Sequence, residues 1–216
     1  MQDLFSPLTP ALPDREVLAE GAVLLRGAAL ETQTDLLQSL ALITAQAPFR
    51  HMVTPGGFTM SVAMSNCGPL GWISDRSGYR YSPVDPQTNL KWPEMPDCFM
   101  QLAQETAAKA GYPDFTPDAC LINRYEPKTK LSLHQDKDEK SPHHPIVSVS
   151  LGLQATFQFG GLKRSDTVHK YALQHGDVVV WGGPSRLNYH GIPTLKDGQH
   201  PLLGCYRINL TFRKAA

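Results

Sequence analysis

The sequence predicts a mostly β fold with flanking helices (α+β), built on a sandwich or barrel such as a jelly roll. Three observations predict it. From residue 119 onward, short strand-like runs recur with turn signals about every 8–12 residues, a spacing typical of sandwiches and barrels. Two longer segments, 31–46 and 97–110, have the length and pattern of helices. No internal repeat or low-complexity tract is visible.

The first part of the chain predicts an arm, a strand and a helix. Residues 1–16 look like a loose arm, and GAVLLRG at 21–27 looks like a strand. Residues 31–46 place leucines and an isoleucine at helical spacing, and Pro48 lies just past the end of this helix.

Residues 48–96 differ in composition. They are rich in glycine, proline and aromatic residues, as in TPGG, NCGPLGW and SGYRYSPVDPQ, which indicates hairpins and loops. We interpret this region as a binding lid built on the main sheet. A plain irregular insertion is the alternative.

A second helix and a series of strands complete the fold. We expect the helix at 97–110, with Asp97 as N-cap and Gly111 as its stop. The expected strands are ACLINRYE (119–126), KLSLHQD (130–136), PIVSVSLG (145–152), ATFQFGG (155–161), KYALQ (170–174), GDVVVWGG (176–183) and YRINLTFR (206–213). One domain, 1–216, then comprises the arm, strand and helix (1–47), the lid (about 48–96) and a helix plus jelly-roll core (about 97–213).

Composition narrows the class of protein. Twenty basic and twenty acidic residues balance to zero net charge, so the whole chain is no polycation for nucleic acid or membrane, although a local basic rim is compatible with this balance. The four cysteines are scattered and form no CxxC, which gives no sign of a disulfide framework or a thiolate zinc site. Reduced thiols favour a cytoplasmic protein.

No targeting or membrane segment is evident. The start MQDLFSPLTPALPDRE carries acids and prolines and is unlike a signal peptide. No run approaches the roughly 18 apolar residues of a membrane span. We also see no association stripe, and we expect a monomer.

One cluster of residue types predicts a metal centre. His134 and Asp136 are two apart on an expected strand, so their side chains share a face. His190 is the best third ligand, because it follows the buried strand GDVVVWGG after a short turn. Two histidines and one carboxylate form the facial triad of non-haem Fe(II) oxygenases, although zinc or manganese fits the same ligands. The other histidines considered stand in polar, turn-like settings where we expect solvation: His143, His144, His169, His175 and His200.

The last strand raises a question about its polar face. Arg207, Asn209, Thr211 and Arg213 alternate with apolar residues, and the simplest interpretation is an amphipathic strand with its arginines in water. Beside an iron centre a second interpretation is stronger. A 2-oxo diacid that chelates iron needs a cation for its far carboxylate, and the planar fork of Arg207 matches a carboxylate.

Further residues complete this second interpretation. Arg213 and Asn209 are candidates to hold the keto-acid end of the diacid. Asn123 and Tyr125, which share a face of the strand in LINRY, are candidates to add hydrogen bonds.

At this point the chain resembles a known family. LINRYEP, LSLHQDKDE, IVSVSLG, FQFGG, GDVVVWGG, YHGI and YRINLTFR are similar to motifs of the bacterial AlkB-type Fe(II)/2-oxoglutarate dioxygenases. The resemblance covers roughly residues 45–213 and implies a double-stranded β-helix (jelly-roll) core with an N-terminal nucleotide-recognition lid. It also implies Fe(II) bound by His134, Asp136 and His190, with 2-oxoglutarate bound by Asn123, Tyr125, Arg207, Asn209 and Arg213, and O2 as second co-substrate.

The resemblance further implies an activity. Family members oxidatively demethylate N-alkylated bases, such as 1-methyladenine and 3-methylcytosine, in single-stranded or double-stranded DNA and RNA, and release formaldehyde, succinate and CO2. A base in a duplex has to be flipped out first. The residues implied to contact substrate are Trp72, Tyr79, Arg80, Tyr81, Asp138 and Arg164. Phe58 is a departure, because bacterial relatives commonly carry a hydroxylated ring there.

Two rival functions stay open at this point. One is a 2-oxoglutarate hydroxylase that acts on a protein side chain or a small metabolite. The aromatic lid and Asp138 favour a flat cationic base instead. The other is a metal-binding module without turnover, and the pair of arginines argues against it, since such a module needs no clamp for a co-substrate.

Overall fold

The computed structural model describes residues 14–216, which form two facing β-sheets and a separate hairpin. The larger sheet has eight strands, in the order β1 (Arg15–Ala19), β2 (Ala22–Leu25), β12 (Val178–Trp181), β9 (Ile146–Gly152), β14 (Arg207–Arg213), β7 (Ala119–Tyr125), β4 (Thr59–Cys67) and β3 (Arg50–Val53). The smaller has four, in the order β11 (His169–Leu173), β10 (Ala155–Phe159), β13 (His190–Ile192) and β8 (Leu131–His134). The hairpin consists of β5 (Gly71–Asp75) and β6 (Gly78–Ser82).

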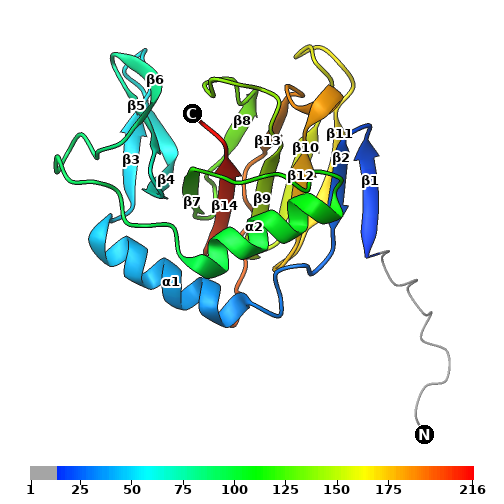
Figure 1. Ribbon diagram of the computed structural model, residues 1–216, viewed down its shortest axis with the longest axis horizontal. Helices are drawn as coiled ribbons and strands as arrows, with labels where there is room; N and C mark the ends of the chain where they lie inside the picture. The colour runs from blue at the N-terminus through cyan, green and yellow to red at the C-terminus, as the bar shows by residue number, and fades with distance from the viewer. Residues whose placement is uncertain (1–13) are drawn as a thin grey trace, which may run out of the picture.

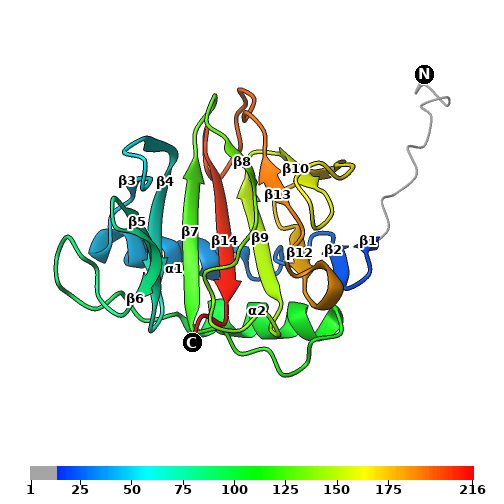
Figure 2. The same cartoon turned by 90° about the horizontal axis from the view of Figure 1, so that it is seen from above.

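Two helices cover one face of the larger sheet. Helices α1 (Gln33–Gln46) and α2 (Asp97–Lys109) lie on the same side of it, away from the smaller sheet (Figure 1; Figure 2). A short 3-10 turn, η1 (Gly183–Ser185), leads from β12 toward β13. The mostly β fold with flanking helices is confirmed, and its two packed sheets are those of a jelly roll.

The larger sheet is buried on both faces because a separate apolar cluster covers each one. On the helix side, Phe99 of α2 packs edge-on against Phe212 of β14, with ring centroids 5.9 Å apart. On the other side, Phe157 of β10 packs against Trp181 of β12 between the sheets. These clusters keep the central strands β7, β9 and β14 rigid, and these three strands carry the polar residues of interest.

Strand β14 lies at the middle of the larger sheet and orients its polar residues toward the smaller sheet. Its apolar residues Ile208, Leu210 and Phe212 belong to the helix-side cluster. The opposite face is also buried: Arg207 is 1% exposed and Arg213 6% exposed. The amphipathic alternation is therefore confirmed, but the interpretation with arginines in water is wrong.

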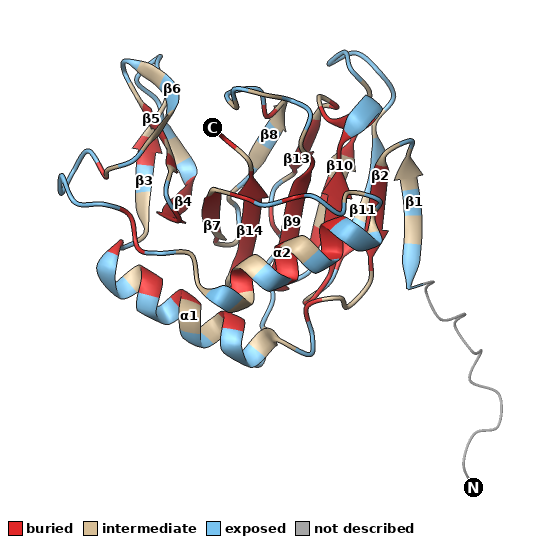
Figure 3. Cartoon of the chain, viewed as in Figure 1, coloured by how far each residue is buried: buried red, intermediate tan, exposed pale blue. Residues whose placement is uncertain are grey.

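The region expected to form a lid contributes to two structures. Strands β3 and β4 extend the larger sheet, and the turn between them closes with the amide of Thr54 donating to the carbonyl of Phe58. Strands β5 and β6 form a hairpin that projects from one end of the molecule and is more exposed than the core strands (Figure 1; Figure 3). The hairpins and loops expected there are thus present, and the division of the domain at about residues 48 and 96 stays a prediction.

Several local expectations need correction. Most of the expected arm, 1–16, lies outside the described residues, but Arg15 already begins strand β1. Asp97 is the first residue of α2 and Pro96 holds the N-cap position, so Asp97 acts only as an acidic residue of the first turn. Gly111 follows the helix with a positive φ of 98°, as a stop residue should. Between residues 14 and 216, none of the helices has the length and apolar character to cross a bilayer.

Candidate active site

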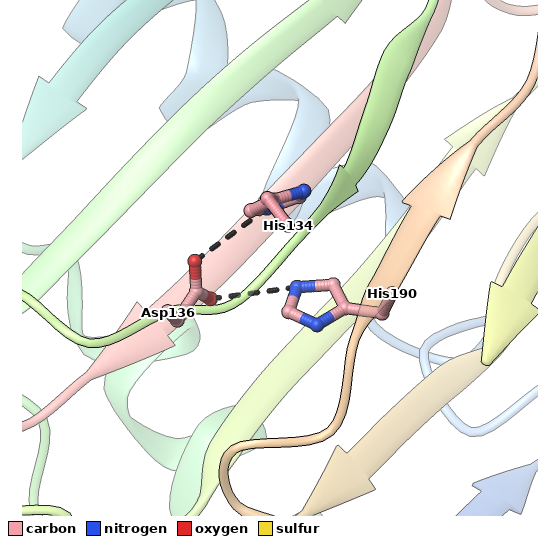
Figure 4. A group of neighbouring side chains, drawn as sticks. All are labelled: His134, Asp136 and His190. Atoms are coloured by element: carbon pink, nitrogen blue, oxygen red, sulfur yellow. Dashed lines mark ion pairs between the residues drawn. The ribbon is translucent and has the colours of Figure 1, made fainter. Parts of the chain in front are cut away.

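His134, Asp136 and His190 come together between the two sheets (Figure 4). His134 ends β8, His190 begins β13, and the two are register partners across these neighbouring strands. Asp136 lies two residues beyond His134. Its Oδ1 is 3.6 Å from Nε2 of His134, and its Oδ2 is 3.7 Å from Nε2 of His190. All three ligand atoms lie within 4.8 Å of one another.

Hydrogen bonds fix the orientation of both imidazoles. Nδ1 of His134 is 2.9 Å from the carbonyl of Ser132, and Nδ1 of His190 is 3.0 Å from the carbonyl of Asn188. A carbonyl only accepts, so each Nδ1 carries the proton and each Nε2 presents a lone pair toward Asp136. Metal-binding histidines commonly make such a hydrogen bond with the ring nitrogen that does not face the metal, and it fixes the orientation of the ring.

Electrostatics keep the carboxylate charged and the buried imidazole neutral. Burial alone would raise the pKa of Asp136, but the Arg213 guanidinium and the two imidazoles hold it well below its usual range. Burial, helped by the neighbouring His134, lowers the pKa of His190 to about 4. A carboxylate and two imidazole nitrogens with room for further ligands suit Fe(II), so the donor set fits the expected metal.

The polar residues of β14 lie beside this cluster. Arg213 donates from Nη2 and Nε to Oδ2 of Asp136, at 2.8 and 3.1 Å. Arg207 donates from Nη2 to Oγ of Ser150 at 3.0 Å, and its guanidinium lies 4.9 Å from the centre of the Tyr125 ring. Among the described residues, Nε and Nη1 of Arg207 are buried without a hydrogen-bond partner, as is Oδ1 of Asn123.

The unpaired nitrogen atoms of Arg207 show whether the cavity suits 2-oxoglutarate. A buried guanidinium with two unpaired nitrogen atoms is costly unless an anion completes it. The far carboxylate of 2-oxoglutarate has the charge and the planar geometry to do so. Asn209 differs, because its amide already donates to Oγ of Ser148 and to the carbonyl of Val149, at 2.8 and 3.0 Å.

A cavity of about 670 Å³ unites these groups. Its wall includes all eight residues predicted to bind the metal and 2-oxoglutarate, together with four of the six predicted substrate contacts: Trp72, Tyr79, Asp138 and Arg164. The volume lies within the usual range of roughly 300–1,000 Å³ for ligand pockets.

The mouth of the cavity is aromatic. The rings of Trp72 and Tyr79 are stacked, with centroids 5.6 Å apart and planes 14° from parallel. Nε1 of Trp72 donates to Oδ2 of Asp138 at 2.8 Å. Arg164 donates to the carbonyl of Leu133 at 2.6 Å and lies over the ring of Tyr189. These groups offer a flat apolar surface edged by a carboxylate and a guanidinium.

Arg80 and Tyr81 do not line the cavity. Arg80 forms a two-pronged ion pair with Asp75 in the same hairpin, at 2.7 and 2.9 Å. Tyr81 turns inward, and its hydroxyl donates to Oε1 of Glu139 at 2.6 Å. Protein carboxylates hold both side chains outside the cavity, and the expectation that Arg80 and Tyr81 contact substrate stays a prediction.

Two buried charged residues beside the cavity, Glu139 and Arg186, are not predicted from the sequence. The side chain of Glu139 is 3% exposed and that of Arg186 is 4% exposed, and they pair at 2.9 Å. Glu139 sits in the charged run DKDEK, which reads as a solvated loop. Arg186 follows η1 with no periodic pattern around it. Only its position four residues before His190 could have singled it out. One further correction concerns His175, whose ring bonds to Gln33 rather than to water alone.

Comparisons with known proteins agree with this geometry. A family model described as the 2OG-Fe(II) oxygenase superfamily matches residues 21–213. The chain is 61% identical over 215 residues to the "Alpha-ketoglutarate-dependent dioxygenase AlkB" of Escherichia coli (strain K12), a match that covers 100% of this chain and 98% of that protein. It is 34% identical over 92 residues to the human "Nucleic acid dioxygenase ALKBH1", covering 43% of this chain and 24% of that protein. Among solved structures, "The structure of OsALKBH1" matches with a TM-score of 0.82 and 30% identity, over 93% of this chain and 99% of that chain.

Proposed function

The chain belongs to the 2OG-Fe(II) oxygenase superfamily and, within it, to the AlkB family, and on this premise we propose that it repairs N-alkylated bases, such as 1-methyladenine and 3-methylcytosine, in DNA and RNA. One observation carries the proposal. A single cavity holds a facial-triad donor set, a buried arginine that lacks an anion, and a pair of stacked aromatic rings at its mouth.

The reaction balances with the co-substrates of the family. Fe(II) held by His134, Asp136 and His190 would, with 2-oxoglutarate, supply the activation of O2, so that one oxygen atom would go to succinate and the other to the alkyl carbon. The hydroxymethyl product on nitrogen then breaks its N–C bond, which leaves N–H on the base and formaldehyde in solution. One equivalent each of formaldehyde, succinate and CO2 results per methyl group removed.

The residues of the chain have distinct roles in this proposal. His134, Asp136 and His190 hold the metal. Arg207 holds the far carboxylate of 2-oxoglutarate with its unpaired nitrogen atoms. Arg213 is the cation nearest the metal end and also fixes Asp136.

The remaining co-substrate contacts are supported to different degrees. Asn123 lines the cavity with an amide nitrogen that donates to Oδ1 of Asn209 at 3.4 Å and has a second hydrogen to offer, and Tyr125 packs under the Arg207 guanidinium. Asn209 lines the cavity, but its amide hydrogens are already used within the protein. It therefore fixes the neighbouring strands as well as bounding the site.

The mouth of the cavity fits an extruded base. Trp72 and Tyr79 offer the flat surface on which a base removed from its stack can rest. His134, whose side chain is 32% exposed, lies across the same cavity and presents a second ring. Adenine and cytosine become cationic on N-methylation and keep an exocyclic amino group, and the Asp138 carboxylate complements both features. Arg164 adds a cation at the rim.

A panel of methylated oligonucleotides tests the proposal. The wild-type protein with Fe(II) and 2-oxoglutarate should release formaldehyde and succinate in equal amounts from oligonucleotides that carry 1-methyladenine or 3-methylcytosine. Unmethylated oligonucleotide and the Asp136→Ala variant should release no formaldehyde. Succinate formation with no formaldehyde from any methylated oligonucleotide would instead favour a hydroxylase of proteins or small metabolites.

We also propose that the enzyme is a cytoplasmic monomer. The absence of a membrane-spanning helix among residues 14–216 is compatible with this location. Light scattering coupled to gel filtration should give a mass near 23.8 kDa. A mass of twice that value, or recovery of the protein in the membrane fraction, would overturn the respective statement.

A further inference from the structure

One face of the β5–β6 hairpin makes two hydrogen bonds to the segment that follows Asp136. Trp72 and Tyr81 are register partners, so their side chains project from the same face of the hairpin. Nε1 of Trp72 donates to Asp138, and the hydroxyl of Tyr81 donates to the next residue, Glu139. The hairpin is thus tied to two successive carboxylates just beyond a metal ligand.

The two bonds differ in their environment. The Trp72–Asp138 bond is exposed at the mouth of the cavity, where water or a base can compete for it. The Tyr81–Glu139 bond is largely buried, since the Glu139 side chain is 3% exposed. Burial raises the pKa of the Tyr81 hydroxyl, which therefore stays protonated and acts as a donor. A bond to a carboxylate in such surroundings persists when the exposed bond breaks.

Glu139 connects this bond to the metal ligand through two arginines. Arg186 donates to Oε2 of Glu139 at 2.9 Å and to the backbone carbonyl of Asp136 at 2.7 Å. Nε of Arg213 lies 3.5 Å from Oε1 of Glu139, while its Nη2 donates to Oδ2 of Asp136. Two cations and two anions balance in this buried group. Removing the charge of Glu139 leaves one cation uncompensated.

The outer strand of the hairpin has few other ties to the catalytic core. Strand β6 pairs only with β5 among the strands of residues 14–216. The Arg80 side chain bonds within the hairpin to Asp75. The carbonyl of Ser82 accepts from Trp92, which lies in the loop after the hairpin. Tyr81 therefore supplies the side-chain link from β6 to the segment that carries the metal ligand.

We propose that Tyr81 and Glu139 are positioning residues that fasten the β5–β6 hairpin to the Arg213–Asp136 pair. This inference rests on the proposed function of the cavity. The buried bond holds the hairpin in place while the exposed Trp72–Asp138 bond gives way to an incoming base. The buried carboxylate of Glu139 then contacts both the hairpin that carries the substrate surface, through Tyr81, and the co-substrate site, through Arg213.

Tyr81→Phe removes the link and leaves the ring in place. In protein loaded with Mn²⁺ and 2-oxoglutarate, hydrogen–deuterium exchange should accelerate by about tenfold or more across residues 71–82, the loss expected for a hydrogen bond to a charged group. Exchange in β7 and β14 should stay unchanged. KM for methylated oligonucleotide should rise more than kcat falls, and the affinity for 2-oxoglutarate should stay at its wild-type value.

Tyr112→Phe is the matched control. Its hydroxyl donates to the backbone carbonyl of Gly21 at 2.9 Å, far along the chain from the hairpin. This variant loses one tyrosine hydroxyl bond of similar length and should show wild-type exchange across residues 71–82. Wild-type exchange of the hairpin in Tyr81→Phe as well would overturn the proposal.

Glu139→Gln tests the other half of the link. It keeps the size of the side chain but removes its charge, so hairpin exchange should accelerate, and 2-oxoglutarate affinity should rise by about tenfold, because the positive charge of Arg213 is then less compensated and attracts the dianion more strongly. Unchanged affinity in a folded variant would refute the connection to Arg213. If this variant does not fold, Tyr81→Phe still decides. Should wild-type protein release no formaldehyde from any lesion, the proposed function fails, and the exchange data judge the link separately.

Discussion

Replacing Arg207 with methionine should have two effects of opposite sign. The side chain is 1% exposed, yet two of its nitrogen atoms have no protein partner. Burial, partly offset by Tyr125, lowers the pKa of the guanidinium, which is the direction expected when a charge loses hydration without full compensation. Without co-substrate, Arg207 therefore destabilises the fold. With co-substrate, it supplies binding free energy.

The structure sets the size of both effects. Replacing incompletely paired buried charge by an apolar side chain of similar length stabilises proteins by up to a few kcal/mol. At about 1–2 kcal/mol and about 2–4 °C per kcal/mol for this chain length, the melting temperature of the ligand-free protein should rise by about 2–8 °C. Two lost charge-assisted hydrogen bonds of about 1.5–3 kcal/mol each should raise the Kd of 2-oxoglutarate by about 10²- to 10⁴-fold.

Calorimetry measures both quantities on the same samples. The wild-type melting temperature should increase when 2-oxoglutarate and Mn²⁺ are added, because a ligand that binds only the folded state stabilises it. The Arg207→Met protein should melt higher than wild type without ligand and should barely respond to 2-oxoglutarate. Isothermal titration then gives the two dissociation constants directly.

Arg26→Met is the contrasting control. Arg26 is half-buried, and although its Nε has no partner among residues 14–216, its guanidinium pairs with Glu16 at 2.8 Å and with Asp177 at 2.9 Å. Its replacement should lower the melting temperature and leave the response to 2-oxoglutarate intact. If ligand-free Arg207→Met melts below wild type, Arg207 does not destabilise the empty fold. If the variant binds 2-oxoglutarate with an affinity close to that of wild type, Arg207 does not bind this co-substrate.

Three further outcomes follow from the site and its surroundings. Asp136→Ala should weaken Mn²⁺ binding, measured by titration calorimetry, by more than the roughly 10- to 100-fold that loss of an outer partner costs, and wild-type affinity would remove Asp136 from the metal site. Trp72→Ala should raise KM for methylated oligonucleotide by about 5- to 100-fold, since stacking contributes about 1–3 kcal/mol per base; an unaltered KM in steady-state assays would leave Trp72 with a packing role only. Burial and the neighbouring His200 lower the pKa of His175 in the folded protein. As the pH falls, the unfolded chain therefore takes up a proton at this residue before the folded chain does. The stability that His175 contributes above about pH 6.5 is lost as the pH falls through its folded-state pKa. His175→Gln should flatten that acid-side slope in urea titrations at a series of pH values, and an unchanged slope would contradict the assignment.

The sequence predicted the co-substrate face because strand geometry is simple. Arg207 lies opposite Tyr125 and Asn209 opposite Asn123 in the register of β14 and β7. Residues that alternate on two strands must share a face when the strands pair in this way. The position of His190 beside His134 depends on a β13–β8 pairing, and that pairing is not visible in the local pattern. The sequence predicts His190 as a ligand from its residue type and from its place a short turn after the buried strand at 176–183.

The contacts of Arg80 and Tyr81 in the hairpin could not be predicted from strand geometry. Arg80 and Tyr81 are polar residues on a short exposed strand, and their sequence context gives no information about which carboxylates lie nearby. Asp75 binds one across the hairpin, and Glu139 binds the other from a segment more than fifty residues later. A long-range hydrogen bond such as Tyr81–Glu139 depends on how two segments approach in space, and no period or motif encodes that approach.

The unpaired polar atoms on β14 indicate which part of this strand binds an anion from outside the protein. Asn209 donates to the neighbouring strand, Thr211 donates to Asn209, and Arg213 donates to Asp136. Arg207 alone on this strand keeps two buried nitrogen atoms without a partner among residues 14–216. A strand evolved only for stability would pair or replace that guanidinium, as it has done with its polar neighbours. The unpaired fork, deep beside the metal cluster, therefore marks the one position on β14 where an anion from outside completes the fold.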